Sequence, residues 1–197
     1  MNIRKILAGA AVAALPLVGN AASFTYEQAF DPATVPFGPT PISLNQFNPG
    51  WGTLLGVTLG IEATLQANIS AENNTKKSVI ATAWIVGDVG ASGPSGLAPV
   101  ISYGSIVGGP VGLAASDGTP GSGPDRTTFG SPLSATDSNS ASTVDPADFG
   151  PFVGLGTFNV NYSGDGGWAV FGISDATVTV SDFQGWGKVT VTYDYMV

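Results

Sequence analysis

The sequence predicts an all-β protein, an antiparallel β-sandwich whose strands are joined by long loops rich in Gly, Ser and Pro. Apolar and polar residues alternate strictly along several segments, as they do in strands with one buried and one solvated face. Gly and Pro separate these segments, and no long segment has helical periodicity. A jelly roll is one sandwich arrangement that fits this order of strands.

The longest alternating segment covers residues 55–71, where every odd position is apolar. Ordinary strands have about 5–6 residues, so we expect either one long strand that bends or two strands joined without a turn. Gly56 and Gly60 lie on the polar face of this segment, where a missing side chain permits strong twist or a bulge. A corner between two sheets of a barrel is the alternative.

Shorter strands are expected around this run. Residues 23–30 and 42–47 alternate, and a turn at residues 48–52 follows them. After the polar turn at 72–77, residues 78–86 form a return strand that alternates less clearly and is expected to be buried on both faces. The first two strands are separated by an extended link that contains Pro32, Pro36, Pro39 and Pro41.

Residues 87–148 carry the weakest strand signal. They are rich in Gly, Ser, Pro and Asp, and the part from 108 to 125 is expected to be a long surface loop. One strand is predicted within this region, at residues 98–107. Asp145 is suited to cap a short helix that has Pro146 at its first position.

The last third of the chain returns to strands, at residues 156–164, 168–182 and 188–195. Residues 183–187, "FQGWG", are expected to join the last two strands as a hairpin. In the final strand the residues expected to face the core are Val189, Val191, Tyr193 and Tyr195. The whole chain then has about eight to ten strands.

The first residues predict an export signal. Arg4 and Lys5 precede an apolar run at residues 6–18 and then small residues, which is the pattern of a secretory signal peptide. We expect cleavage after Ala21, so that residues 1–21 are the signal peptide and residues 22–197 form a single domain. A membrane anchor is less favoured, because the run is short and Ala-rich.

The mature chain is strongly acidic. Removing Arg4 and Lys5 from a chain of formal net charge −8 leaves −10. This charge argues against nucleic acid or anionic lipid as a partner. The chain has no Cys, so its fold depends on its core and its sheet hydrogen bonds rather than on disulfides.

Four ordered segments carry a family resemblance: "LNQFNPGWGTLLGVTL", "ENNTKKSV", "DPADFGPFVGLGTFNV" and "GKVTVTYDY". In order and spacing they resemble the choice-of-anchor E domain of bacterial exported proteins, over about residues 24–195. The resemblance implies export and a place at the cell surface. It carries over no catalytic residues, because the family has no established activity. Such domains are often followed by a PEP-CTERM-type sorting tail, whereas this sequence ends two residues after Tyr195. We therefore expect no anchoring through the C-terminus.

The composition excludes several classes of enzyme. The chain has no His and no Cys, which excludes Ser–His and Cys–His catalysis and zinc sites built on those residues. A two-carboxylate glycosidase is the remaining option. The mature chain offers few carboxylates for it: Glu27, Glu62 and Glu72, together with aspartate pairs that are too close in sequence to define a cleft. We expect a protein that is not an enzyme.

Calcium is the cation that the loops could hold, because it prefers hard oxygen ligands. No "DxDxDG" spacing is present, and aspartates in loops more often form turns or caps. We therefore expect no cofactor, with calcium as the alternative. The candidate ligands are Asp117, Asp125, Asp145 and Asp148.

The four tryptophans allow two interpretations. Trp51, Trp168 and Trp186 stand next to Gly in or beside turns, where aromatic side chains cover the ends of a sandwich core. The same residues, with Trp84, could instead form a platform on which sugar rings stack. We favour the first interpretation.

Together these observations predict a secreted, non-catalytic structural protein of the bacterial cell surface or extracellular matrix, such as that of a biofilm. A carbohydrate-binding module that binds extracellular polysaccharide is the alternative. The Pro-dense link suggests a route to self-association, in which residues 23–30 detach and add as a strand to the open edge of a neighbouring copy. Pairing of this segment within its own sheet is the simpler expectation.

Overall fold

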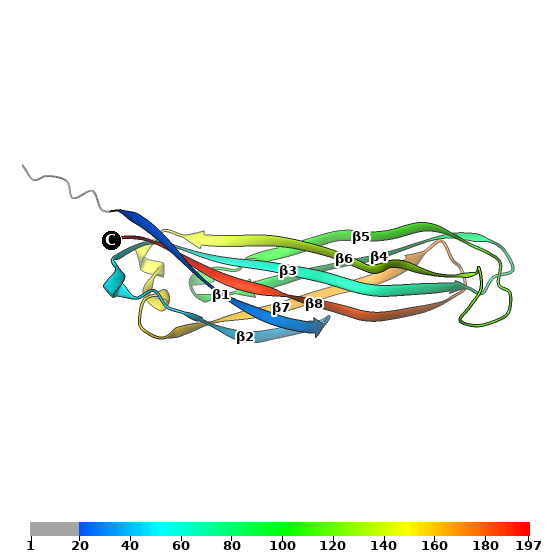
Figure 1. The fold of residues 1–197 in the computed structure, drawn as a ribbon, viewed down its shortest axis with the longest axis horizontal. Helices are drawn as coiled ribbons and strands as arrows, with labels where there is room; N and C mark the ends of the chain where they lie inside the picture. The colour runs from blue at the N-terminus through cyan, green and yellow to red at the C-terminus, as the bar shows by residue number, and fades with distance from the viewer. Residues whose placement is uncertain (1–19) are drawn as a thin grey trace, which may run out of the picture.

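The computed structural model describes residues 20–197, which form eight strands in two antiparallel four-stranded sheets (Figure 1). The first sheet has the order β1-β8-β3-β6 and the second the order β2-β7-β4-β5. The predicted signal peptide, residues 1–21, lies outside the described residues except for Asn20 and Ala21. The strands are β1 (Ala21–Thr34), β2 (Phe37–Asn45), β3 (Thr53–Asn73), β4 (Val79–Ser92), β5 (Val100–Leu113), β6 (Arg126–Thr143), β7 (Thr157–Phe171) and β8 (Ala176–Met196).

The strand pairing is that of one long hairpin wound into a jelly roll. β4 pairs with β5, β3 with β6, β2 with β7 and β1 with β8. These successive pairs alternate between the two sheets, and the pairings of β3 with β8 and of β4 with β7 complete them. The predicted all-β sandwich is therefore confirmed, and its strand order is that of the jelly roll.

The sandwich is long and narrow (Figure 1). At one end, here called the proximal end, the backbone amide of Val197 bonds to the carbonyl of Asn20 at 3.1 Å. At the opposite, distal end lie the loops at residues 74–78, 114–125 and 172–175. The proximal connections contain four short 3-10 helices, which are η1 (Pro49–Trp51), η2 (Pro94–Gly96), η3 (Pro146–Asp148) and η4 (Gly150–Phe152).

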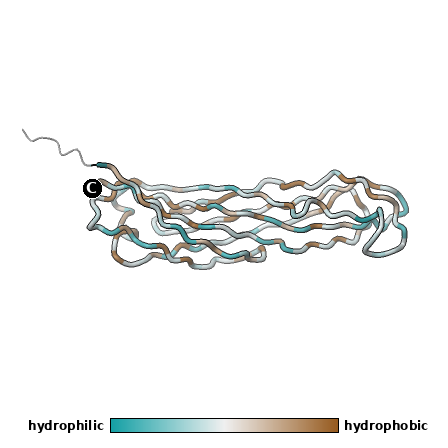
Figure 2. Tube along the Cα trace, in the orientation of Figure 1, coloured by the Kyte–Doolittle hydropathy of each residue, from teal (hydrophilic) through white to brown (hydrophobic). Residues whose placement is uncertain are grey.

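The alternating run seen in the sequence is the central strand β3. It has 21 residues and pairs with β8 on one side and β6 on the other, all within one sheet. Figure 2 shows apolar and polar residues alternating along the strands. The long strand is confirmed. Of the two glycines that permit a bulge, Gly56 lies at a register shift and Gly60 does not. The residues that β3 turns toward the core are almost fully buried: Val57, Leu59, Ile61, Ala63, Leu65, Ala67, Ile69 and Ala71.

Two buried tyrosines connect the sheets. Tyr103 of β5 donates its hydroxyl hydrogen to the carbonyl of Ala63 in β3. Tyr193 of β8 donates to the carbonyl of Asn45 at the end of β2, at 2.8 Å. Burial raises the pKa of Tyr103 to about 12, with a smaller contribution from the Asp137 carboxylate. Burial also raises the pKa of Tyr193 well above its ordinary value.

Strand β6 was not predicted. Residues 126–143 are mostly Ser, Thr, Asp and Gly, a composition that indicates a loop. Only Phe129 and Leu133 are large apolar residues with buried side chains in this strand. The strand exists because its backbone continues the ladder of β3 from Val57 to Glu72, so its conformation is imposed by its neighbour.

Strand β4 also differs from the prediction. It extends through residues 87–92, which the sequence assigned to a loop. Its core face is fully buried at Ala81, Ala83 and Ile85. Its outer face is partly exposed, so the strand is not buried on both faces.

The predicted hairpin at residues 183–187 is wrong. β8 is one continuous strand of 21 residues with a register shift next to Asp182. The turn before it lies at residues 172–175 and leads from β7 in one sheet to β8 in the other. The glycines in "FQGWG" serve close packing instead of a turn. A side-chain carbon on Gly185 would lie 2.9 Å from the Phe37 ring, and one on Gly187 would collide with the Glu62 carbonyl.

All prolines within strands lie on edge strands. Apart from Pro36, which lies between the two strands, the prolines of the predicted link belong to β1 and β2, each of which is the edge of its sheet. Proline cannot donate a ladder hydrogen bond, so it is tolerated at an edge and discourages pairing there. The edge prolines are Pro32, Pro39, Pro41, Pro110 and Pro132.

Candidate functional site

The distal half of the sandwich has an open edge, defined here as residues 165–171 of β7 and residues 176–182 of β8. Pairing of β1 with β8 ends at Thr34 and Gln184, and pairing of β2 with β7 ends at Phe37 and Gly164. Beyond these points β8 pairs only with β3, and β7 pairs only with β4, among the residues that the structure describes. Figure 1 shows β1 and β2 stopping halfway along the molecule.

The open edge exposes side chains that a longer β1 and β2 would cover. Trp168 pairs with the fully buried Ile85 and therefore lies on the inner face of its sheet, yet it is 46% exposed. Val178 and Val180 of β8 are opposite Ala71 and Ile69 and are only partly buried. A sheet edge with unpaired backbone groups and partly exposed apolar residues can accept another strand.

The four tryptophans do not share one face. Trp51 packs at the proximal end against Phe47 and Phe24, with ring centroids 5.8 and 5.5 Å apart. Trp84 lies on the outer face of its sheet, and Trp186, opposite Thr64, lies on the outer face of the other sheet. Trp51 therefore covers a core end as predicted, and a single platform of all four does not form.

Two of the three mature-chain glutamates are paired with one lysine. On the outer face of the first sheet, Lys188 Nζ lies 3.4 Å from a carboxylate oxygen of Glu27 and 3.9 Å from one of Glu62. Both glutamate side chains are more than half exposed. An exposed, charge-paired arrangement on the outer face of a sheet does not offer the enclosure that glycoside hydrolysis uses.

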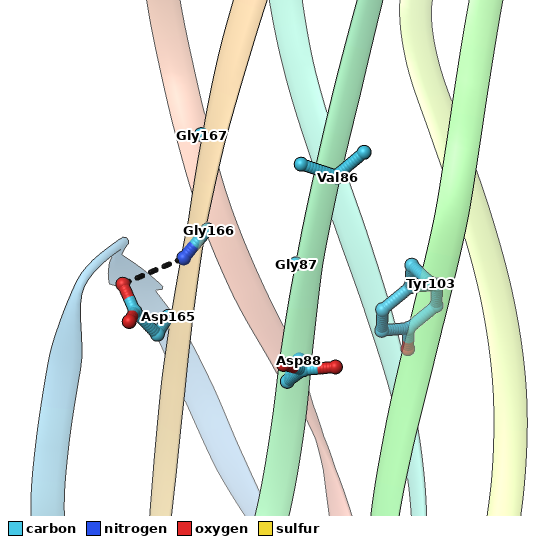
Figure 3. A pocket seen from close by; sticks show the side chains of 7 residues that line it. All are labelled: Val86, Gly87, Asp88, Tyr103, Asp165, Gly166 and Gly167. Atoms are coloured by element: carbon cyan, nitrogen blue, oxygen red, sulfur yellow. Dashed lines mark hydrogen bonds between the residues drawn. The ribbon is translucent and has the colours of Figure 1, made fainter.

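A shallow hollow of about 290 Å³ lies on β4 and β7 (Figure 3). Its lining includes three glycines, Gly87, Gly166 and Gly167. Asp88 and Asp165 are direct cross-strand neighbours beside it. Figure 3 shows the Asp165 carboxylate turned away from Asp88, and its oxygen accepts a hydrogen bond from the Gly166 amide at 2.8 Å. The two carboxylates therefore do not converge on one point.

The four loop aspartates predicted as calcium ligands fall into two pairs at opposite ends. Asp145 and Asp148 belong to the proximal end, where Asp145 accepts from the Ala147 amide at 2.9 Å and caps η3, as predicted. Asp117 and Asp125 belong to the distal loop 114–125. The predicted gathering of all four is therefore wrong. Within residues 20–197 no group of three or more acidic side chains converges on one point.

Among residues 20–197, no helix is long and apolar enough to cross a membrane.

No family model matches the chain, and no curated protein matches it. Two solved structures were found, both of infectious bursal disease virus. The structure of the Gx strain is 10% identical in sequence to this chain and has a TM-score of 0.17. The match includes 90% of this chain and 41% of the viral chain. The structure of the Gt strain is also 10% identical and has a TM-score of 0.12. The match includes 92% of this chain and 41% of the viral chain. Likenesses this low carry no argument about fold or function.

Proposed function

We propose that the chain is an exported, non-catalytic structural protein of the bacterial cell surface or extracellular matrix, and that it works by self-association. The observation that carries this proposal is the open edge on the distal half of the sandwich. Unpaired backbone groups along a strand are a template for another chain. Six residues of strand span about 20 Å, which is long enough for several ladder hydrogen bonds.

The segment that best fits the open edge of a neighbouring copy is residues 23–30 of β1. In the isolated chain β1 pairs with β8 of its own sheet, and its other side is a sheet edge. No proline occurs in β1 before Pro32. Phe24 is 42% exposed and gives this strand apolar surface to contribute.

Such a contact would be head-to-tail. The donor segment lies in the proximal half and the open edge in the distal half, so two different surfaces meet. Heterologous contacts that do not close into a ring generate filaments. A filament is the form in which a domain without a catalytic centre would serve as matrix material.

Electron microscopy of the mature protein tests this proposal. We expect filaments from residues 22–197 and none after deletion of residues 23–30. Circular dichroism checks that the deleted chain keeps its sheet content. The proposal fails if the intact chain never assembles, or if the folded deletion variant assembles equally well.

Export is tested separately. Mass spectrometry of protein collected outside the cells is expected to find a chain that begins near residue 22, and an intact Met1 would contradict export through a cleaved signal.

Binding of extracellular polysaccharide is the second candidate function. One observation favours it: Trp84 and Phe171 stack on the outer face of β4 and β7, with ring centroids 5.4 Å apart, and Phe171 is 50% exposed. Exposed aromatic rings can stack on apolar faces of sugars. Polysaccharide would then change tryptophan fluorescence in the wild type and not in Trp84→Ala, whereas an unchanged wild-type signal would exclude this role.

A further inference from the structure

The distal loop contains a buried carboxylate oxygen without a partner. Asp125 is fully buried. Its Oδ2 accepts a hydrogen bond from the Asp117 amide at 2.9 Å, but its Oδ1 has no hydrogen-bond partner among the described residues. A buried charged oxygen without a partner is costly, so native structures satisfy such atoms with a proton, water or an ion.

A second carboxylate oxygen faces the same space. Asp117 uses Oδ1 to accept from the Thr119 amide at 2.7 Å, which leaves Oδ2 free of the loop's hydrogen bonds. A side-chain carbon on Gly123 would collide with this Oδ2 and would lie 2.9 Å from Oδ1 of Asp125. The two oxygens therefore converge beside Gly123, in a space that exists because residue 123 has no side chain.

Among residues 20–197 no cationic side chain forms a salt bridge with this pair. The neighbouring Arg126 donates to the Gly121 carbonyl at 3.1 Å and lies 3.4 Å from the Ser70 hydroxyl oxygen. Both salt bridges in residues 20–197 belong to Lys188, on another part of the molecule. Glu72, which is 7% exposed, adds further negative charge nearby and holds the loop through the Gly121 amide at 2.8 Å.

We propose that Asp117 Oδ2 and Asp125 Oδ1 bind one calcium ion, which holds the loop at residues 114–125 against the end of β3. Two carboxylates call for a divalent cation, and calcium tolerates irregular sites completed by backbone carbonyls and water. Magnesium demands near-ideal octahedral geometry and gives up its waters reluctantly. Since only two acidic side chains converge, the site belongs with the weak calcium sites of extracellular modules, with Kd of about 10⁻⁴–10⁻³ M.

The loop is built so that an ion would stabilise the fold. Asn73 at the end of β3 is fully buried, and its backbone amide bonds to the Asp125 carbonyl at 2.8 Å. Its side-chain amide donates to the carbonyls of Lys77 and Ala114. An ion that fixes Asp125 therefore fixes the junction of three segments, and binding only to the folded state raises stability.

Thermal unfolding of the mature chain tests the proposal. After treatment with EDTA, calcium at 10 mM is expected to raise Tm by about 3–10 °C, in a saturable way. Magnesium at the same concentration is expected to raise it much less. Equilibrium dialysis is expected to find one calcium ion per chain.

Matched substitutions separate this site from general charge effects. Asp125→Asn keeps the shape of the side chain and is expected to abolish the calcium response, while leaving a folded chain that is at least as stable as the calcium-free wild type. Asp88→Asn removes an exposed carboxylate on another face and is expected to leave the response intact.

Three outcomes would overturn the inference. The first is a wild-type Tm that does not respond to calcium up to 10 mM. The second is a calcium response that Asp125→Asn retains. The third is a wild type that does not respond to calcium but whose Tm rises when the pH is lowered from 7 to 5, while the Tm of Asp125→Asn does not rise. This result would mean that the two carboxyl groups share a proton instead of binding calcium.

Discussion

Tyr103 shows how a single residue couples the two sheets, and it gives the fold a pH dependence at the alkaline end. Its hydroxyl donates to the Ala63 carbonyl on the opposite sheet, and burial raises its pKa from 10.0 to about 12. Because the pKa is raised in the folded state, the neutral hydroxyl contributes stability that is fully present below pH 10. That stability is lost as the pH rises through 12.

We therefore predict that the free energy of unfolding falls between pH 10 and pH 12. The part of the loss due to Tyr103 is on the order of 2–3 kcal/mol. In Tyr103→Phe this part should disappear, although the variant is less stable at neutral pH because the Ala63 carbonyl loses its partner. Urea unfolding at pH 8 and pH 11 measures both effects, and an equal alkaline loss in the two proteins would refute the assignment to Tyr103.

A substitution at Val191 tests whether this position of β8 faces the core. Its side chain is fully buried between the sheets, as the alternation in the sequence predicts. We expect Val191→Asp to destabilise the fold by several kcal/mol, because it buries a charge without a partner. Thr190→Asp, on the outer face of the same strand, is expected to cost much less. Similar melting temperatures for Val191→Asp and the wild type would contradict the burial of this position.

Single residues could be predicted from the sequence where pattern alone decides their place. Val189, Val191 and Tyr193 are fully buried because strict alternation leaves them no other face. The pairing of Asp117 with Asp125, and its separation from Asp145, could not be predicted. Those residues are brought together or kept apart by the path of the jelly roll, which no local pattern encodes.

At the scale of elements, sequence patterns predicted the strands whose alternation is clear and missed β6, which contributes little to the core and mainly completes its sheet. β3 alternates along its whole length because it is central and buries one face. β6 buries few apolar residues, and its other positions are small and polar. Its strand conformation comes from the ladder with β3, a long-range interaction that a local reading cannot include.

Because β6 has few buried apolar side chains, its stability depends strongly on each of them. Phe129 is 1% exposed and is the largest buried side chain in the strand. We predict that Phe129→Ala lowers the free energy of unfolding by about 3–5 kcal/mol. Ser138→Ala, at an exposed position of the same strand, is expected to change it by less than about 0.5 kcal/mol. Denaturant unfolding measures both, and equal effects would mean that Phe129 does not anchor the strand.

The prediction of a turn within β8 was wrong because glycine occurs both in turns and at positions where another element packs closely against a strand. In "FQGWG" it indicates a turn by local rules. In the structure Gly185 and Gly187 allow Phe37 and the backbone of β3 to approach β8 closely. A glycine next to alternating Thr and Val residues is thus compatible with a continuous strand when another element packs against it.

At the scale of the whole molecule, the half-length of β1 and β2 is the feature with the clearest functional consequence. It leaves the proximal half with two complete four-stranded sheets and the distal half with the open edge. Prolines on all four edge strands discourage pairing elsewhere. The segments of the open edge contain no proline, so they are the places where strand addition meets least resistance.

Sedimentation velocity of Thr179→Lys tests the proposed self-association most directly. Thr179 is exposed on the outer face of β8 within the open edge, where a lysine discourages another strand from pairing. Thr192→Lys is the matched control, because Thr192 lies on the same face of β8 but between β1 and β3. We predict that the wild type and Thr192→Lys assemble and that Thr179→Lys stays monomeric with an unchanged fold. Assembly of folded Thr179→Lys to the same extent as the wild type would contradict self-association through the open edge.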